Sequence, residues 1–394
     1  MTALKRLTQR LTNRLTTTHV GIALILVLLG DLVGITIVPR PITLKAPGEL
    51  ADVIPELQRF VEKTRGRRFH KPVKIEQSDD LGRFTTGLQQ SDTASQEQKD
   101  RDAAIDQAAV LRALGLVDTT YDPLAATTAL SNDVLGVYRP DEHTLVVRPG
   151  PVTPRMRLTL VHELTHALDG EHHELRFSER TDRLIPDESA TSFRALAEGD
   201  AYYVEKLYEA SMSEADRAAV DAARQASPPP SVPEALLFLA SYPYSAGRNF
   251  VENLVQRDGM QAIDRAFKDP PTTSEHVLNP DKYRADDPPR NVAKPLPRGR
   301  TVVQRGVFGE LLLRLLVSRA AGNDVARQVG AGWGGGRYVA WRENADVCVA
   351  VTLVMDTAQD AQELQDAIAK WAATKPRSKV VPGPPVAFEN CVER

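Results

Sequence analysis

The stretch LTLVHELTHAL occupies residues 158–168 and contains two histidines, His162 and His166, four positions apart. Residues at this spacing project from the same face of an α-helix, so both imidazoles can reach one metal ion. Glu163 stands beside the first histidine, where its carboxylate can act as general base on a metal-activated water. The neighbouring residues are apolar, which predicts a buried helix over about 154–172. Polar groups inside such a helix need a partner, and the pattern therefore predicts a zinc site.

A catalytic zinc site usually takes three protein ligands and a water, so a third ligand must come from elsewhere in the chain. Glu198 is the candidate, within FRALAEGDAYYVE (193–205) on a second predicted helix over about 188–210. Small residues allow two helices to approach closely, which a shared ion requires. Glycine weakens a helix interior, so Gly199 indicates tight packing at this point. The small residues around Glu198 are Ala195, Ala197, Gly199 and Ala201.

His172 is the alternative third ligand. It follows His166 by six residues, which is the spacing of the third histidine in His-Glu-x-x-His-x-x-Gly-x-x-His zinc enzymes. Asp169 occupies the glycine position of that pattern, and Gly170 comes one residue late. The turn that the pattern needs is missing at its place, which favours Glu198.

Two aspartates are candidates to orient the ligands, because a ligating histidine usually donates its second ring N–H to a carboxylate or carbonyl. Asp169 lies three residues after His166, on the metal-facing side of its helix. Asp200 lies two residues after Glu198 and so points away from it on an ideal helix. Each is alternatively an ordinary surface carboxylate.

Three tyrosines are candidates to stabilise an oxyanion. Tyr202 lies four residues after Glu198, and Tyr242 and Tyr244 belong to the sequence SYPY. Alternatively, all three pack in the core with a hydrogen-bonded hydroxyl. The isolated histidines His143 and His276 receive no role, and His173 is interpreted as a solvated neighbour of the motif.

The stretches VHELTHALDGEHHEL (161–175) and ALAEGDA (195–201) together resemble a group of bacterial and archaeal zinc metallopeptidases of the gluzincin type. The resemblance implies zinc on His162, His166 and Glu198, with Glu163 catalytic. It also implies an α+β fold, in which a mainly helical zincin-like domain carries a small β-hairpin or sheet. The chain has HALDGEHHEL where the family has a glutamine-rich stretch such as HALQDQHF, a change that leaves the metal residues untouched. Supporting similar stretches lie at 136–147, 243–251, 270–283 and 331–341.

Composition bounds the alternatives. The chain has 394 residues, which predicts two domains or one elaborated domain with a tail. Its formal net charge of −3 argues against a nucleic-acid partner. No glycine-rich phosphate loop precedes a predicted helix, so nucleotide binding has no support.

The N-terminus predicts a membrane anchor. Residues 20–38 read VGIALILVLLGDLVGITIV, with Asp31 as the one charge. At about 1.5 Å per residue this helix would span roughly 28 Å, close to the hydrocarbon thickness of a bilayer. Basic residues lie in the segment 1–19, so we expect that segment in the cytoplasm and the rest of the chain outside it, on a single-pass protein of the cell membrane. A cleaved signal peptide, with secretion, is the alternative.

Further patterns divide the rest of the chain. We expect a linker at 39–50, the zincin-like domain at 51–285, a proline-rich connector at 286–299 and a C-terminal α+β region at 300–394. Cys348 and Cys391 either form one disulfide or remain two free thiols. Helices are predicted at 51–65, 103–116, 246–267, 307–320 and 358–373, a hairpin at 134–148, and strands within 71–77, 337–341, 347–354 and 386–391.

These observations predict a membrane-anchored zinc metallopeptidase with one Zn²⁺ per chain and a peptide or protein substrate. One alternative is a non-catalytic, membrane-tethered, metal-containing scaffold or binding protein that uses residues 300–394 for interaction. Another is a zinc hydrolase of non-peptide amides. Glu163 favours an enzyme over a scaffold, because a purely structural metal site has no need of a glutamate between its histidines. The patterns specify neither a substrate sequence nor an oligomeric state.

Overall fold

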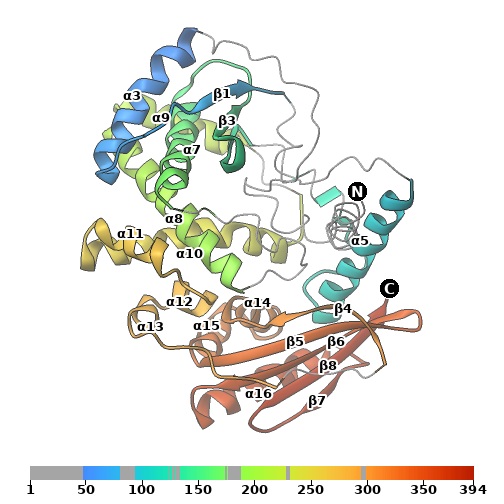
Figure 1. The fold of residues 1–394 in the computed structure, drawn as a ribbon. Helices are drawn as coiled ribbons and strands as arrows, with labels where there is room; N and C mark the ends of the chain where they lie inside the picture. The colour runs from blue at the N-terminus through green and yellow to red at the C-terminus, as the bar shows by residue number, and fades with distance from the viewer. Residues whose placement is uncertain are drawn as a thin grey trace, which may run out of the picture.

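The computed structural model describes residues 48–79, 94–123, 125, 126, 129, 134–173, 175, 188–227, 231–293 and 299–394. Over these residues the chain has an α+β fold, as predicted. A mainly helical part with a small sheet lies on one side, and a five-stranded sheet with its own helices lies on the other (Figure 1). The predicted basic terminus and anchor, and the linker up to residue 47, fall outside the described residues.

The small sheet is built from three short strands. β1 (Lys74–Gln77) runs parallel to β3 (Thr144–Val147), and β2 (Gly136–Arg139) runs antiparallel to it. A 3₁₀ turn over Pro140–Glu142 joins β2 to β3, which confirms the predicted hairpin. The strand order β1-β3-β2 leaves β2 at an edge of the sheet. Helix α3 (Gly48–Arg65) packs nearby and buries the apolar side chains of Leu50, Ile54, Leu57 and Val61.

Two helices follow the hairpin, α7 (Pro154–His172) and α8 (Glu188–Ser211). Pro154 stands at the first position of α7, where its missing N–H is no loss, and the Thr153 hydroxyl accepts a hydrogen bond from the Met156 N–H. Both predicted helices are confirmed, with α8 one residue longer than expected. α7 is buried along most of its length, including both motif histidines and Glu163.

Helix α10 (Glu234–Asp258) crosses α8 at two glycines. A Cβ on Gly199 would lie 2.3 Å from the Gly247 carbonyl oxygen, and a Cβ on Gly247 would lie 2.0 Å from the Ala195 carbonyl oxygen. The two backbones therefore touch at the residue next to Glu198, which confirms the tight packing that Gly199 indicates, although the partner is α10 and not the helix that carries His162 and His166. α9 (Glu214–Ala226) packs against α7.

The helix predicted over 246–267 is wrong in its bounds. α10 begins at Glu234, directly after Pro233, and ends at Asp258, because the next residue, Gly259, has a φ of 75° that breaks the helical conformation. A separate helix, α11 (Gln261–Lys268), follows. The apolar spacing continues across Gly259, so periodicity alone joined two helices and missed the start of the first.

The C-terminal sheet has the order β4-β5-β6-β8-β7, with every neighbouring pair antiparallel. A disulfide joins Cys348 and Cys391, which lie directly opposite each other on β6 and β8. α16 packs against three of these strands, and α14 packs against α16. The elements are β4 (Thr301–Val307), α14 (Glu310–Ala321), α15 (Asn323–Ala331), β5 (Trp333–Glu343), β6 (Asp346–Met355), α16 (Ala358–Ala373), β7 (Lys379–Val381) and β8 (Val386–Glu393).

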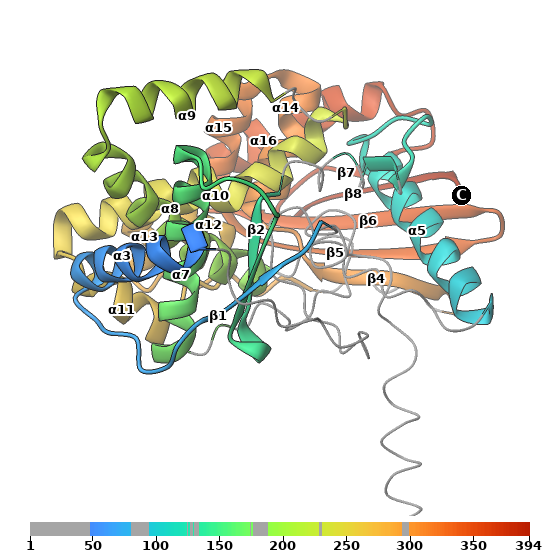
Figure 2. The same cartoon turned by 90° about the horizontal axis from the view of Figure 1, so that it is seen from above.

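Helix α5 (Ala94–Leu114) packs against strands β6 and β8 of this sheet, although it ends more than 200 residues before β6 begins (Figure 2). The Trp371 indole N–H donates to the Leu114 carbonyl at 2.9 Å, and the Asn390 amide donates to the Ala113 carbonyl at 2.8 Å. The buried carboxylate of Asp106 pairs with the guanidinium of Arg394 at 2.6 Å. The helix predicted over 103–116 is thus confirmed, but it begins earlier.

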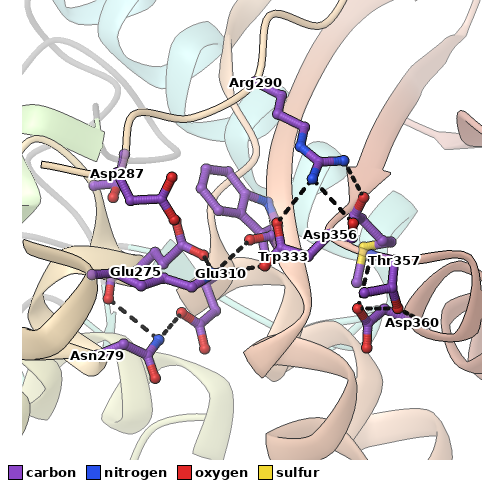
Figure 3. Close-up of polar contacts among 12 residues, drawn as sticks. Glu275, Asn279, Asp287, Arg290, Glu310, Trp333, Asp356, Thr357 and Asp360 are labelled. Carbon is purple, nitrogen blue, oxygen red and sulfur yellow. Dashed lines mark hydrogen bonds and ion pairs between the residues drawn. The ribbon is translucent and has the colours of Figure 1, made fainter. Parts of the chain in front are cut away.

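Short helices α12 (Ser274–Leu278) and α13 (Pro280–Arg284) join the two parts of the molecule. The Asn279 amide donates to Glu310 at 2.9 Å, and Arg290 donates to the main-chain oxygen of Asp356 at 3.0 Å (Figure 3). The Glu188 carboxylate, at the first residue of α8, accepts from the Ser274 N–H at 2.6 Å, and the Ser274 hydroxyl accepts from the N–H of Leu311 on α14 at 3.0 Å. The start of α8 is therefore tied to the C-terminal region.

The assignment to a membrane is corrected by the structure. The anchor predicted at 20–38 lies outside the described residues. Among the residues that are described, no helix combines the length and the apolar character that crossing a bilayer requires. The two longest, α8 and α10, are interrupted by charged side chains such as Glu198, Asp200 and Arg248. Localisation at the cell membrane therefore forms no part of the proposed function.

Candidate metal centre

Three side chains from α7 and α8 meet at one point. The Nε2 atom of His162 lies 3.1 Å from Oε2 of Glu198 and 3.2 Å from Nε2 of His166. The Nε2 atom of His166 lies 3.4 Å from the same Glu198 oxygen. All three residues are buried: His162 is 8% exposed, and His166 and Glu198 are 1% exposed each. The structure thus brings together the three ligands predicted from the sequence.

The spacing of the three atoms fits a zinc ion. Bonds of 2.0–2.2 Å in tetrahedral geometry hold ligand atoms about 3.3–3.5 Å apart. The observed separations of 3.1, 3.2 and 3.4 Å lie at or just below this range. Two imidazole nitrogens and a carboxylate oxygen that converge in a buried space are also the donor set that zinc prefers. His162, His166 and Glu198 would therefore hold the ion.

Glu163 on α7 extends its side chain to the edge strand β2. Its Oε2 atom accepts a hydrogen bond from the Tyr138 N–H of β2 at 2.7 Å. Burial raises the pKa of this carboxyl above its usual value, although the neighbouring histidines His162 and His166 oppose the shift. A buried carboxylate with a raised pKa, held beside a metal site, is suited to accept and return a proton.

His162 has a second carboxylate partner that the sequence analysis missed. Its Nδ1 atom lies 3.1 Å from Oε2 of Glu205, so the ring can donate there while Nε2 faces the ligand group. Glu205 is seven residues after Glu198 on α8 and therefore on the same helix face. This seven-residue spacing could have indicated from the sequence that Glu205 lies beside the ligands. Arg194, one turn before Glu198, donates to the other Glu198 oxygen at 3.4 Å.

Asp169 and Asp200 are buried with side chains that are 0% exposed, so neither is a surface carboxylate. Both contact the guanidinium of Arg65, the last residue of α3: Nη2 lies 3.5 Å from Asp169 and Nε lies 2.9 Å from Asp200. Burial raises the pKa of both carboxyls, and the attraction of Arg65 opposes the shift. Arg65 is 97 positions before His162, and nothing in the local sequence signals this contact.

The three candidate tyrosines lie in different places. The Tyr244 ring stacks on the His162 imidazole, with centroids 6.1 Å apart and planes inclined by 30°. The Tyr202 ring lies under the Arg248 guanidinium at 5.5 Å. The Tyr242 hydroxyl is buried and donates to the carbonyl of Ser274, the first residue of α12, at 3.4 Å. Tyr244 is therefore the tyrosine that contacts a predicted ligand.

His172 does not join the ligand group. Its Nε2 atom donates to the Arg68 carbonyl at 3.0 Å, and its ring packs edge-on against His70. The interpretation of His173 as solvated is wrong, because its side chain is 6% exposed and stacks on Phe267 at 4.6 Å. Burial lowers the pKa of His173 to about 4.

His143 and His276 each have partners away from the ligands. His143 lies 2.8 Å from the Tyr138 hydroxyl and 3.1 Å from Glu171, and His276 donates to the Asp287 carbonyl at 2.8 Å. In the part of the chain that the structure describes, one other group combines metal-ligating side chains, Glu343 with Cys348 and Cys391. Its two sulfurs are joined in the disulfide and offer no thiolate to a metal.

Comparison with known proteins bears on the C-terminal region alone. Residues 298–389 match a family model described as a domain of unknown function, DUF8575. No curated protein and no solved structure matches the chain. The match covers α14 to α16 and most of the five-stranded sheet, and it does not include α7 or α8, which carry the candidate metal centre.

Proposed function

We propose that this chain is a zinc-dependent metallopeptidase of zincin-like type that hydrolyses peptide bonds. The observation that carries the proposal is the meeting of His162, His166 and Glu198, with Glu163 held beside them by the Tyr138 N–H. The resemblance of the HELTHAL and EGDA stretches to gluzincin peptidases supports the same function. A metal site with a structural role alone would leave the placement of Glu163 without a purpose.

Zinc bound here would act as a Lewis acid, polarising the scissile carbonyl and lowering the pKa of a water toward ~7. Glu163 takes a proton from the attacking water and passes it to the leaving amine nitrogen. The Tyr138 N–H fixes the orientation of the Glu163 carboxylate for both transfers. Glu205 holds the His162 ring, and Tyr244 lies against that ring as the candidate donor to the oxyanion.

The edge strand β2 favours a peptide over other amides. Among the described strands it pairs with β3 alone, and the Tyr138 N–H on its opposite side points to Glu163. The N–H and C=O of one residue in a strand point to the same side, so the Tyr138 carbonyl faces the same region. An extended peptide that adds to this edge would lie along the catalytic glutamate.

The test uses the full-length chain and the variant Glu163→Gln, which keeps the shape of the side chain but removes the base. We expect wild type to bind one zinc and to cleave members of a peptide library. Glu163→Gln should retain the zinc, and its peptidase activity should fall about 10²–10⁴-fold. Glu56→Gln is the matched control, because that exposed carboxylate pairs with Arg157. A wild-type chain that binds no zinc, or a Glu163→Gln variant of equal activity, would contradict the proposal.

A further inference from the structure

The metal ligands sit on two helices, and a third helix holds those two together with a buried cation. α3 packs against both α7 and α8 (Figure 1). Its last residue, Arg65, has a side chain that is 0% exposed. A cation is favoured at the C-terminal end of a helix, where carbonyl groups accumulate negative charge. The guanidinium extends from this end to carboxylates on the two ligand helices.

Arg65 contacts one aspartate on each ligand helix. Asp169 lies one helical turn after His166 on α7, and its Oδ1 is 3.5 Å from Nη2. Asp200 lies two residues after Glu198 on α8, and its Oδ2 is 2.9 Å from Nε. A third carboxylate, Asp264 on α11, lies 3.1 Å from Nη2. One guanidinium thus joins four helices.

The shape of the guanidinium matters as well as its charge. Its nitrogens lie in one plane at fixed separations, so it holds two carboxylates at a set distance, whereas an ammonium group is a single point charge on a flexible stem. Ligand positions in a metal site tolerate shifts of about ±0.2 Å. The Asp169 and Asp200 carboxyls also lie close enough to share a hydrogen bond with each other, and the guanidinium contacts both of them. Arg65 therefore links α7 to α8 within one helical turn of the ligands.

We propose that Arg65 is a positioning residue of the metal centre, which fixes Glu198 on α8 relative to His166 on α7 through its contacts with Asp200 and Asp169. The inference rests on the proposed function, because it takes the three ligands to bind zinc. It concerns the metal affinity of the site and requires no knowledge of the substrate.

The experiment compares Arg65→Lys with Arg67→Lys in the full-length chain. Arg67 is the matched control, because it lies two residues away, is partly exposed and pairs with Asp264 at 2.9 Å. Zinc affinity is measured by competition with a chromophoric chelator, and ligand geometry by the visible absorption of the Co²⁺-substituted protein. Circular dichroism and urea unfolding in EDTA establish that each variant is folded without metal.

We expect Arg65→Lys to weaken zinc binding about 10–100-fold and to reduce the tetrahedral Co²⁺ absorption, with Arg67→Lys within about threefold of wild type. Asp169→Asn should weaken zinc binding as well, and the double variant with Arg65→Lys should lose less than the sum of the two free-energy changes, because both act through one contact. Wild-type affinity and absorption in Arg65→Lys, or additive losses in the double variant, would overturn the proposal.

If Arg65→Lys is unfolded without metal, the zinc affinity of Asp169→Asn is the deciding measurement. An affinity equal to that of wild type overturns the inference. Failure of the proposed function gives a different result. In that case the wild-type chain itself binds no zinc, or binds it and cleaves no peptide, whatever the behaviour of Arg65→Lys.

Discussion

Replacing Gly199 by alanine should damage the metal centre through the packing of two helices. The added Cβ would lie 2.3 Å from the Gly247 carbonyl oxygen, whereas Cβ atoms essentially never approach another atom within 3.0 Å. The contacting atom belongs to a backbone and cannot rotate away, so α8 and α10 must separate by at least about 0.7 Å, the difference between these two distances. Glu198 is the adjacent residue, and a metal ligand tolerates a shift of about ±0.2 Å.

Two effects on stability oppose each other. Alanine is a better helix former than glycine by about 1 kcal/mol, and overpacking of a core costs about 1–3 kcal/mol. We expect the crowding to dominate, with a net loss in the free energy of unfolding of up to about 2 kcal/mol. Because the displaced segment carries Glu198, zinc affinity should also fall at least about 10-fold.

Urea unfolding of the metal-free protein and chelator competition for zinc measure the two quantities. Gly170→Ala is the matched control: it also lies inside a helix, but its Cβ would lie 3.2 Å from the terminal oxygen of the Tyr138 side chain rather than against a backbone. This variant should keep wild-type zinc affinity. A Gly199→Ala protein as stable as wild type and equally tight for zinc would refute the reasoning.

Two further predictions concern single carboxyls. Glu205→Gln should weaken zinc binding about 10–100-fold by chelator competition, because Glu205 accepts from Nδ1 of His162 at 3.1 Å; unchanged affinity would remove its role in holding the ring. Burial raises the pKa of Glu310 from 4.5 to about 8, so the folded chain keeps this proton at pH values where the unfolded chain has lost it. The free energy of unfolding that protonated Glu310 contributes is therefore at its maximum below about pH 4.5. It falls by up to about 1.4 kcal/mol per pH unit as the pH rises and is lost at about pH 8. Glu310→Gln should show a shallower fall in the free energy of urea unfolding between pH 5 and 8 than wild type; parallel curves would contradict the assignment.

The parts of the fold that depend on neighbouring residues could be predicted from the sequence. Thr153 and Pro154 mark the start of α7, and the apolar spacing around the motif gives its length. The small residues near Glu198 indicated a close helix contact, and the structure shows that contact at Gly199 and Gly247. In each case the signal lies within the helix whose start, length or packing it indicates, whereas the partner helix of Gly199 was not indicated.

Contacts between distant segments could not be predicted in this way. Arg65 meets Asp169 and Asp200 only after three helices pack, and a buried arginine at a helix end resembles a surface arginine in sequence. The position of His173 was misjudged for the same reason, because Phe267, which covers it, lies far along the chain. The bond between Glu163 and the Tyr138 N–H depends on the packing of β2 against α7, a relation that no motif encodes.

The packing of α5 on the C-terminal sheet has a consequence for folding during synthesis. α5 ends at Leu114, whereas its partner strand β6 begins at Asp346. At about 5–20 residues per second, a ribosome needs roughly 10–50 s to make the chain between them. Throughout that interval the apolar face of α5 has no native partner, and the start of α8 lacks the anchorage that Ser274 and α14 provide. A nascent chain would therefore carry every metal ligand well before it could hold them in place, so the proposed hydrolase would acquire its activity only once α12 and α14 have been made.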